Sequence, residues 1–177
     1  YTSTRLVSRG KGDFLYGRFE VSAKIPSGRG TWPAVWMLPT DRAYGGWPAS
    51  GEIDVLEHVG YDPDVVHISV HTHAYHHSIG TQKTAKRKVE NSMTAFHRYR
   101  VDWTPDYIRG YVDDVQLFEF TNEGSGYQTW PFDKRFHWLI NLAVGGNWGG
   151  QQGIDDTAFP AHFEIDYVRV YPLVETP

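Results

Sequence analysis

The sequence predicts an all-β protein built as a sandwich of two antiparallel sheets. Short segments that alternate apolar and polar side chains follow one another along the chain, and glycine, proline and aspartate separate them. No segment carries a convincing long helical period, and we find no internal repeat, low-complexity tract or interdomain linker. Short strands at even spacing are typical of two-sheet architectures.

The first half of the chain contains four predicted strands. The segment 14–25 alternates apolar and polar residues and stops at a Pro-Ser-Gly sequence, whereas the apolar run 34–38 stops at a single proline. Two further strands are predicted over 52–58 and 65–73, which are rich in valine, isoleucine and histidine.

The second half of the chain contains five predicted strands. The segment 99–103 alternates and ends before Thr-Pro-Asp. The segments 107–112 and 115–120 flank Asp113-Asp114, where we expect a hairpin turn. The remaining predicted strands are 136–144 and 163–171.

Composition and charge exclude several classes of function. The 177 residues suffice for one domain with a sizeable core, and the formal net charge of -4 gives no sign of a nucleic-acid or anionic-membrane partner. Without cysteine there is no disulfide framework, cysteine nucleophile or thiolate metal site. No stretch approaches the ~18 apolar residues of a membrane span, and the first five residues contain no apolar signal-peptide core.

Aromatic residues make up 15% of the chain and include seven tryptophans. Aromatic rings stack on the apolar faces of pyranose sugars, so this excess fits a carbohydrate-binding protein. Strands of β-sandwiches also favour aromatic residues, so composition alone does not separate the two interpretations.

Three acidic residues, Glu52, Asp54 and Glu57, lie close together in one predicted strand. Side chains alternate along a strand, so Glu52 and Asp54 share a face while Glu57, at an odd offset, points to the other. A β-bulge at Val55-Leu56 restores the parity, and bulges are frequent beside active sites. Three carboxylates on one face repel one another, which favours a chemical role for them.

Two carboxyl groups across a scissile bond are what glycoside hydrolysis requires, with a separation of about 5–5.5 Å in retaining enzymes. A third acid between them can raise the pKa of the acid and hold the nucleophile. The alternatives are a solvent-exposed acidic strand and a calcium site, although the loop spacing of an EF-hand is absent.

Tryptophans and glycine-rich loops near these acids are candidates for sugar binding. Trp47 lies in a Gly-Gly-Trp-Pro loop five residues before Glu52, where a core role is hard to explain, so we predict a sugar platform. Trp36 faces either the cleft or the core, and Trp32 is assigned to core or loop packing. Trp148, in a glycine-rich loop, is either a second platform or an ordinary packed tryptophan.

Histidines follow the signature strand. His58 alternates away from Glu57 and is expected to be a packing residue. His71 and His73 share a predicted strand face and, with His76 and His77, raise the alternative of a transition-metal site, which the absence of a nearby carboxylate in sequence disfavours.

The stretch Glu-Ile-Asp-Val-Leu-Glu at residues 52–57 resembles the signature of glycoside hydrolase family 16, in its bulged form with two residues between the aspartate and the second glutamate. Further similar blocks follow in order along nearly the whole chain. They are residues 16–20, 23–26, 32–38, 46–48, 70–72, 101–104, 141–146 and 163–171.

The resemblance implies a jelly-roll sandwich of the concanavalin A-like type with a concave cleft, and retaining endo-hydrolysis of a β-glycan. Carried over by position, Glu52 is the nucleophile, Glu57 the general acid/base and Asp54 the assisting acid between them. The bulged signature is most similar to that of laminarinases, which cut β-1,3-glucans. Mixed-linkage glucan, a red-algal galactan and a non-catalytic glucan-binding sandwich are the alternatives.

The resemblance also suggests substrate-binding and metal-binding residues. It places Trp36 in the cleft, His71 beside Glu57, and Asn141 and Trp148 at the glycine-rich loop as substrate contacts. It implies no catalytic cofactor, but a structural calcium held partly by Asp166. The basic run Lys83, Lys86, Arg87 and Lys88, which a sulfated substrate would favour, is instead assigned to a solvated loop face.

We therefore expect a single catalytic domain over residues 1–172 and a short tail over residues 173–177. The family's usual N-terminal segment is missing from the sequence, so we expect a companion segment or partner to complete the fold. Polymeric glycans lie outside cells, so secretion is expected.

Overall fold

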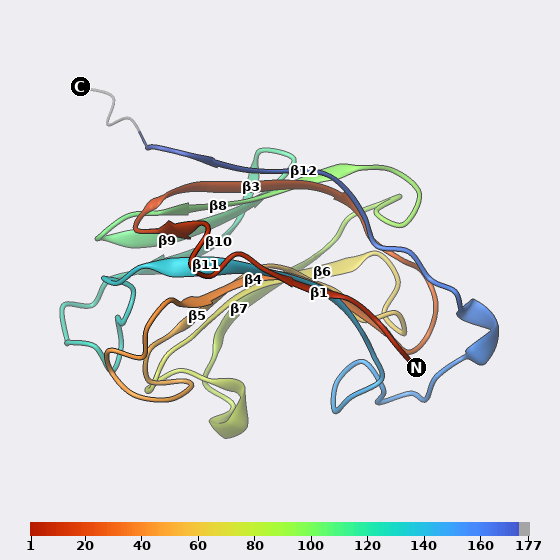
Figure 1. Ribbon diagram of the computed structural model, residues 1–177, viewed down its shortest axis with the longest axis horizontal. Helices are drawn as coiled ribbons and strands as arrows, with labels where there is room; N and C mark the ends of the chain where they lie inside the picture. Colours follow the sequence, from red (N-terminus) through yellow and green to blue (C-terminus); the bar gives the residue numbers. More distant parts are fainter. Residues whose placement is uncertain (174–177) are drawn as a thin grey trace.

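The computed structural model describes residues 1–173, so residues 174–177 of the expected tail lie outside the described residues. Figure 1 shows two layers of strands, one above the other. Helix in the described part is limited to two 3₁₀ turns, η1 (His77–Ile79) and η2 (Asp156–Ala158). Neither turn is long or apolar enough to cross a bilayer.

One layer is a seven-stranded antiparallel sheet in the order β1-β11-β4-β5-β6-β7, with β2 paired to the edge of β11. Its central strands β4 and β5 carry the acidic signature and the tryptophans that precede it. The strands are β1 (Arg5–Val7), β2 (Asp13–Phe14), β4 (Thr31–Pro39), β5 (Glu52–Glu57), β6 (Val65–His71), β7 (Lys83–Lys88) and β11 (Phe136–Val144).

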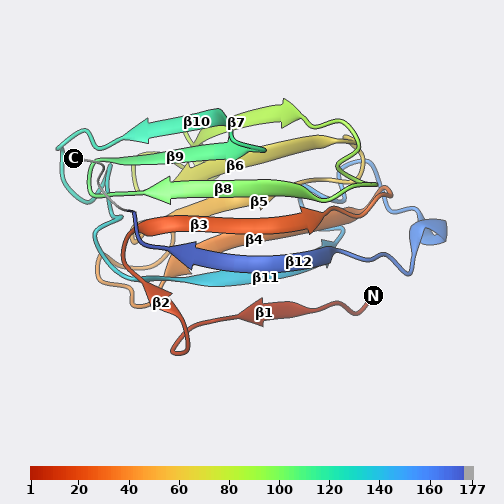
Figure 2. The same ribbon diagram turned by 90° about the horizontal axis from the view of Figure 1, so that it is seen from above.

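The other layer is a five-stranded antiparallel sheet in the order β10-β9-β8-β3-β12. Figure 2 shows its strands running roughly along those of the first sheet, as in an aligned sandwich. The strands are β3 (Gly17–Lys24), β8 (His97–Trp103), β9 (Tyr107–Val112), β10 (Val115–Thr121) and β12 (Glu164–Tyr171).

The core lies between the sheets and is built by alternation along each strand. Phe19 and Val21 of β3 are fully buried against Val35 and Met37 of β4 and their neighbours. The intervening residues of each strand face outward, so the outer face of the seven-stranded sheet is free for other use. Figure 1 shows this face curving between loops that hang below both ends of the sheet.

The predicted all-β, two-sheet fold is confirmed, and each predicted strand has an observed counterpart. Asp113 and Asp114 form the expected hairpin turn, with φ values of 48° and 67°. The segment 14–25, however, is two strands. The chain turns at Tyr16 and Gly17, and a Cβ on Gly17 would lie 2.8 Å from the carbonyl oxygen of Tyr171, so only glycine fits there.

Two strands at sheet edges escaped prediction. The basic run, assigned above to a loop, is the edge strand β7, although its side chains from Lys86 onward are indeed exposed. Charged side chains on an exposed edge hide the alternation on which strand prediction depends. The three-residue strand β1 is too short and too exposed to give a pattern.

Candidate active site

The site begins where the loop 40–51 enters β5 on the outer face of the seven-stranded sheet. Gly51 has φ 90°, and a Cβ there would meet Pro131 at 2.9 Å and Phe132 at 3.0 Å. Glycine therefore allows the chain to pass close to these buried residues and start the strand. Glu52 follows at once and pairs with His71 of β6.

A β-bulge lies in β5 where parity required it. Asp54 pairs with Trp36 and Leu56 with Val35 of β4, so Val55 is the extra residue between them. Ile53, Val55 and Leu56 are all fully buried in the core. The bulge thereby turns Glu57 to the same outer face as Glu52 and Asp54, and the prediction of a bulge at Val55-Leu56 is confirmed.

Glu52 is held by one neutral donor and one histidine. The indole Nε1–H of Trp47 donates to Oε2 of Glu52 at 2.8 Å. His71 Nε2 lies 3.8 Å from Oε1 of Glu52 and 3.3 Å from Oδ2 of Asp54. The expectation that His71 sits beside Glu57 is therefore wrong, because the bulge displaces Glu57 along the strand and pairs it with His67.

Burial and mutual repulsion govern the charge of the three acids. The Asp54 side chain is only 2% exposed and that of Glu52 15%. Burial raises the pKa of all three carboxyl groups, well above the ordinary range for Glu52 and Asp54. The charge of Glu57 raises the pKa of Asp54 further, whereas the hydrogen bond from Trp47 lowers that of Glu52.

Glu57 has its own tryptophan donor. Trp32 Nε1 donates to Oε1 of Glu57 at 3.2 Å, and this hydrogen bond lowers the pKa of Glu57 against the effect of burial. The assignment of Trp32 to core or loop packing is therefore wrong. Trp32 and Trp36 are four residues apart in β4 and share its outer face, so parity with Trp36 could have revealed it.

Trp148 and His67 complete the surroundings of Glu57. The Trp148 ring packs edge-on against Trp32 at 5.6 Å and against His67 at 5.0 Å between ring centroids. Trp148 is exposed, as a sugar platform requires. His67 had not been singled out in the sequence. Burial, aided by the charge of Lys86, lowers its pKa to about 4, so its imidazole is neutral near neutral pH.

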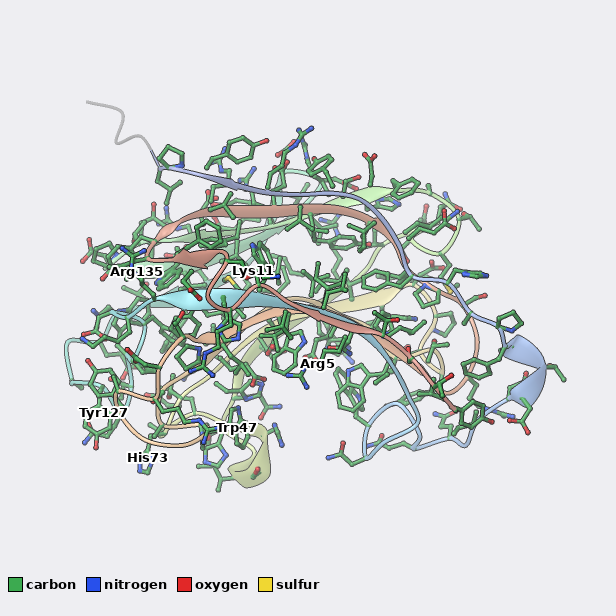
Figure 3. All side chains as sticks on the ribbon, viewed as in Figure 1. Arg5, Lys11, Trp47, His73, Tyr127 and Arg135 are labelled. Carbon is green, nitrogen blue, oxygen red and sulfur yellow. The ribbon has the colours of Figure 1, made fainter. Side chains whose placement is uncertain are left out.

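On the other side of the acids, Trp36 and Asn141 face the same surface. Trp36 Nε1 donates to Oδ1 of Asn141 at 2.8 Å, and the guanidinium of Arg5 lies 4.9 Å above the Trp36 ring. Trp36 is therefore in the cleft rather than the core. Arg5, which Figure 3 shows on this same side of the sheet, carried no signal in the sequence because β1 was not recognised.

His58 packs as predicted. It is fully buried, and its Nδ1 lies 2.8 Å from the carbonyl oxygen of Val65. Of the histidines considered for a metal, His71 ends β6 and His73 is exposed beyond it.

Within residues 1–173, the group of side chains that could share an ion is Glu52, Asp54 and His71, whose ligand atoms lie within 4.8 Å of one another. Asp166 is exposed at a bulge of β12 and belongs to no such group among these residues.

The arrangement suits acid/base and nucleophilic chemistry at one bond. Two glutamates separated by a buried aspartate face a surface lined by aromatic rings, and each glutamate receives one indole N–H. A pyranose chain laid across the strands would have one acid on each side of a linkage, with rings of Trp36 and Trp148 toward opposite ends.

Comparison with known proteins agrees with this geometry. The model of the family described as "Glycosyl hydrolases family 16" matches residues 1–169. The beta-glucanase of Rhodothermus marinus is 55% identical over 182 residues, which are 99% of this chain and 64% of that protein. The chain thus spans less than two thirds of the length of this relative.

Solved structures show the same similarity. The X-ray structure of the laminarinase from Rhodothermus marinus is 54% identical, covers 97% of this chain and 71% of its own, and superimposes with a TM-score of 0.95. SCLam, a non-specific endo-beta-1,3(4)-glucanase co-crystallised with 1,3-beta-D-cellotriosyl-glucose, is 44% identical, with coverages of 96% and 65% and a TM-score of 0.92.

Proposed function

The chain belongs to glycosyl hydrolases family 16, and we propose that it is a retaining endo-hydrolase of β-1,3-glucan. One observation carries the proposal: the bulge in β5 places Glu52, Asp54 and Glu57 together on the open face of the sheet. The similar proteins named for beta-glucan or laminarin hydrolysis support the substrate class. Hydrolases of this kind need no catalytic cofactor.

In the first step, an Oε of Glu52 attacks the anomeric carbon and forms an ester with the sugar. The bond from that carbon to the glycosidic oxygen breaks, and Glu57 transfers its proton to the leaving oxygen. Burial raises the pKa of Glu57, which favours the protonated form that this step requires.

In the second step, Glu57, now a carboxylate, removes a proton from water, and the water oxygen attacks the anomeric carbon. The ester bond to Glu52 breaks and the sugar leaves with its original anomeric configuration. Two inversions at the same carbon give net retention.

Asp54 acts on Glu52 rather than on the substrate. It is the most buried of the three acids, and its Oδ2 has no hydrogen-bond donor in the structure. We propose that Asp54 keeps a proton and donates it to Glu52, which stabilises Glu52 as a carboxylate until it attacks.

The substrate is proposed to cross the strands along the aromatic surface. Trp36, Trp47 and Trp148 offer rings at successive points, and the described outer face holds no row of cations beyond Arg5 and the edge strand β7. A neutral glucan fits such a surface better than a sulfated galactan, which needs paired cationic contacts.

A hydrolysis panel tests the proposal. Purified protein is incubated with laminarin, mixed-linkage β-glucan, agar and carrageenan, and reducing ends are measured. Laminarin should give the highest rate, with the β-anomer formed first by NMR. In Glu52→Gln and Glu57→Gln hydrolysis should fall by a factor of about 10³ or more while laminarin binding persists. Full activity in either variant, or inversion at the anomeric carbon, would refute the assignment.

We further propose a companion segment that completes the sandwich edge. A cavity of about 590 Å³ opens between β1 and β11 on one side and the approach to β12 on the other, and Ile140, Leu142 and Phe163 help to line it. Leu6 of β1 is 60% exposed beside it. Such an open edge favours pairing with a further strand. Full activity of a monomer with the 20.3 kDa mass of these residues would contradict this.

A structural calcium at Asp166 also stays a prediction. Asp166 supplies one exposed carboxylate without a second acidic side chain grouped with it in residues 1–173, so other ligands would have to be carbonyl oxygens or a companion segment. An unchanged melting temperature after chelation would remove the calcium. Secretion is proposed because the polymeric substrate lies outside the cell.

A further inference from the structure

Trp47 reaches Glu52 from a loop that the core does not hold. Its side chain is 44% exposed, and Gly45 and Gly46 precede it in the loop 40–51. A Cβ at Gly46 would meet no atom within 4 Å, so the chain is loosely surrounded there. The position of the indole must therefore be set by what its ring contacts.

The aromatic rings around Trp47 are three imidazoles. The nearest is that of His77, 5.0 Å away between ring centroids and inclined by 35°, and His76 and His71 lie at 5.7 Å and 5.9 Å. Figure 3 shows Trp47 beside the turn η1 that carries His77. Ring pairs at these distances attract one another.

His77 also contacts His71, with the two rings 5.3 Å apart and nearly perpendicular. Trp47 and His71 are the two side chains that flank the carboxylate of Glu52. His77 thus packs against both neighbours of Glu52, although no hydrogen bond or ion pair joins it to an acid in the described chain.

The turn η1 is anchored well enough to serve as a support. The amide of Gly80 donates to the carbonyl of His77 at 3.0 Å and that of Thr81 to the carbonyl of His76 at 3.2 Å. The Thr81 hydroxyl donates to the carbonyl of Ala74, whose own amide donates to Gln128 in the loop before β11. The support is therefore tied to the loops on both sides.

We infer that His77 is a positioning residue for the reaction: its ring holds Trp47 and His71 where they contact Glu52. The inference rests on the proposed function for its kinetic consequence but not for the contact itself. Without the His77 ring the indole leaves Oε2 of Glu52 part of the time. The carboxylate then loses a donor that stabilises its ionised form.

The kinetic test compares His77→Ala, His77→Phe and His73→Ala in wild-type background. In His77→Ala, kcat/KM on laminarin should fall between about twofold and about tenfold, and its acid limb should move to higher pH. His77→Phe, which keeps an aromatic ring, should restore most of the loss. His73→Ala changes an exposed histidine of the same loop and should behave as wild type.

Fluorescence provides a readout that needs no turnover. Quenching by acrylamide is measured for wild type, His77→Ala and each protein with Trp47→Phe added, so that subtraction isolates Trp47 among the seven tryptophans. His77→Ala should make Trp47 more quenchable. An unchanged Trp47 signal together with an unchanged acid limb would overturn the inference, as would equal losses in His77→Ala and His77→Phe.

The two proposals fail in different ways. If wild-type protein hydrolyses no β-glucan, the proposed function fails while the quenching comparison still decides whether His77 holds Trp47. If wild-type protein is active and quenching is unchanged, the function stands and the role of His77 is refuted.

Discussion

Trp47 Nε1 donates a hydrogen bond to Oε2 of Glu52 over 2.8 Å, and so links a half-exposed loop to the first residue of β5. Burial raises the pKa of Glu52, and this donor opposes that effect. The charge of Glu52 consequently depends on the position of a loop as well as on the sheet that carries it.

Replacing Trp47 by phenylalanine should move the acid limb of the kcat/KM profile to higher pH. The nucleophile must be ionised, and loss of the indole donor raises the pKa of Glu52. We expect kcat/KM on laminarin at the optimum to fall about tenfold. The matched control is Trp36→Phe, whose indole donates to Asn141 instead, so its acid limb should stay in place. An unmoved limb in Trp47→Phe would contradict the prediction.

Replacing Trp32 by phenylalanine should affect the opposite limb. The Trp32 hydrogen bond lowers the pKa of Glu57, and the first step needs Glu57 protonated. Without the donor that pKa rises, so the basic limb should move to higher pH while the acid limb stays. Trp36→Phe again serves as the control in the same strand and on the same face. A shift of both limbs, or of neither, would argue against separate donors for the two glutamates.

Much of the site could be predicted because it lies in one strand. Glu52, Asp54 and Glu57 share β5, so the parity rule was enough to require a bulge, and the structure places it at Val55. The same rule applied to β4 would have brought Trp32 to the face of Trp36. That contact was overlooked although its signal was present.

Other parts of the site depend on which strands become neighbours. His71 lies beside Glu52 and Asp54 because the bulge shifts the register between β5 and β6, and a sequence does not state that register. Arg5 reaches Trp36 only because β1 adds to the edge of β11. His67 likewise meets Trp148 across a turn of chain that no local pattern reveals.

Asp54→Asn should stabilise the fold at neutral pH and impair catalysis. Burial and Glu57 raise the folded-state pKa of Asp54 above its ordinary 3.8, so the folded state binds this proton more tightly than the unfolded state. Stability is then lost as pH rises from 3.8 through the raised pKa, and asparagine escapes that loss. We expect the free energy of unfolding in urea to rise by about 1 kcal/mol at neutral pH. Equal stability of the two proteins at neutral pH would contradict a buried, proton-retaining Asp54.

His67 should make the protein less stable as pH falls from 6.5 to about 4. Burial depresses its folded-state pKa to about 4, so the unfolded chain binds a proton in this window that the folded chain does not. His67→Gln removes this difference. Urea unfolding across the window should therefore show a smaller loss in the variant, and comparison with wild type cancels the carboxyl groups that titrate in both.

Lys86→Gln tests the cause of that depression. The charge of Lys86 lowers the pKa of His67 after burial does, so removing the charge should raise the pKa of His67 above about 4 without restoring 6.5. NMR titration of the imidazole measures this directly. Lys88→Gln on the same exposed edge strand is the matched control, because Lys88 pairs with Val65 rather than with His67. If both variants leave the pKa unchanged, burial alone determines it. A larger shift in Lys88→Gln than in Lys86→Gln would mean that the register of β7 against β6 is wrong.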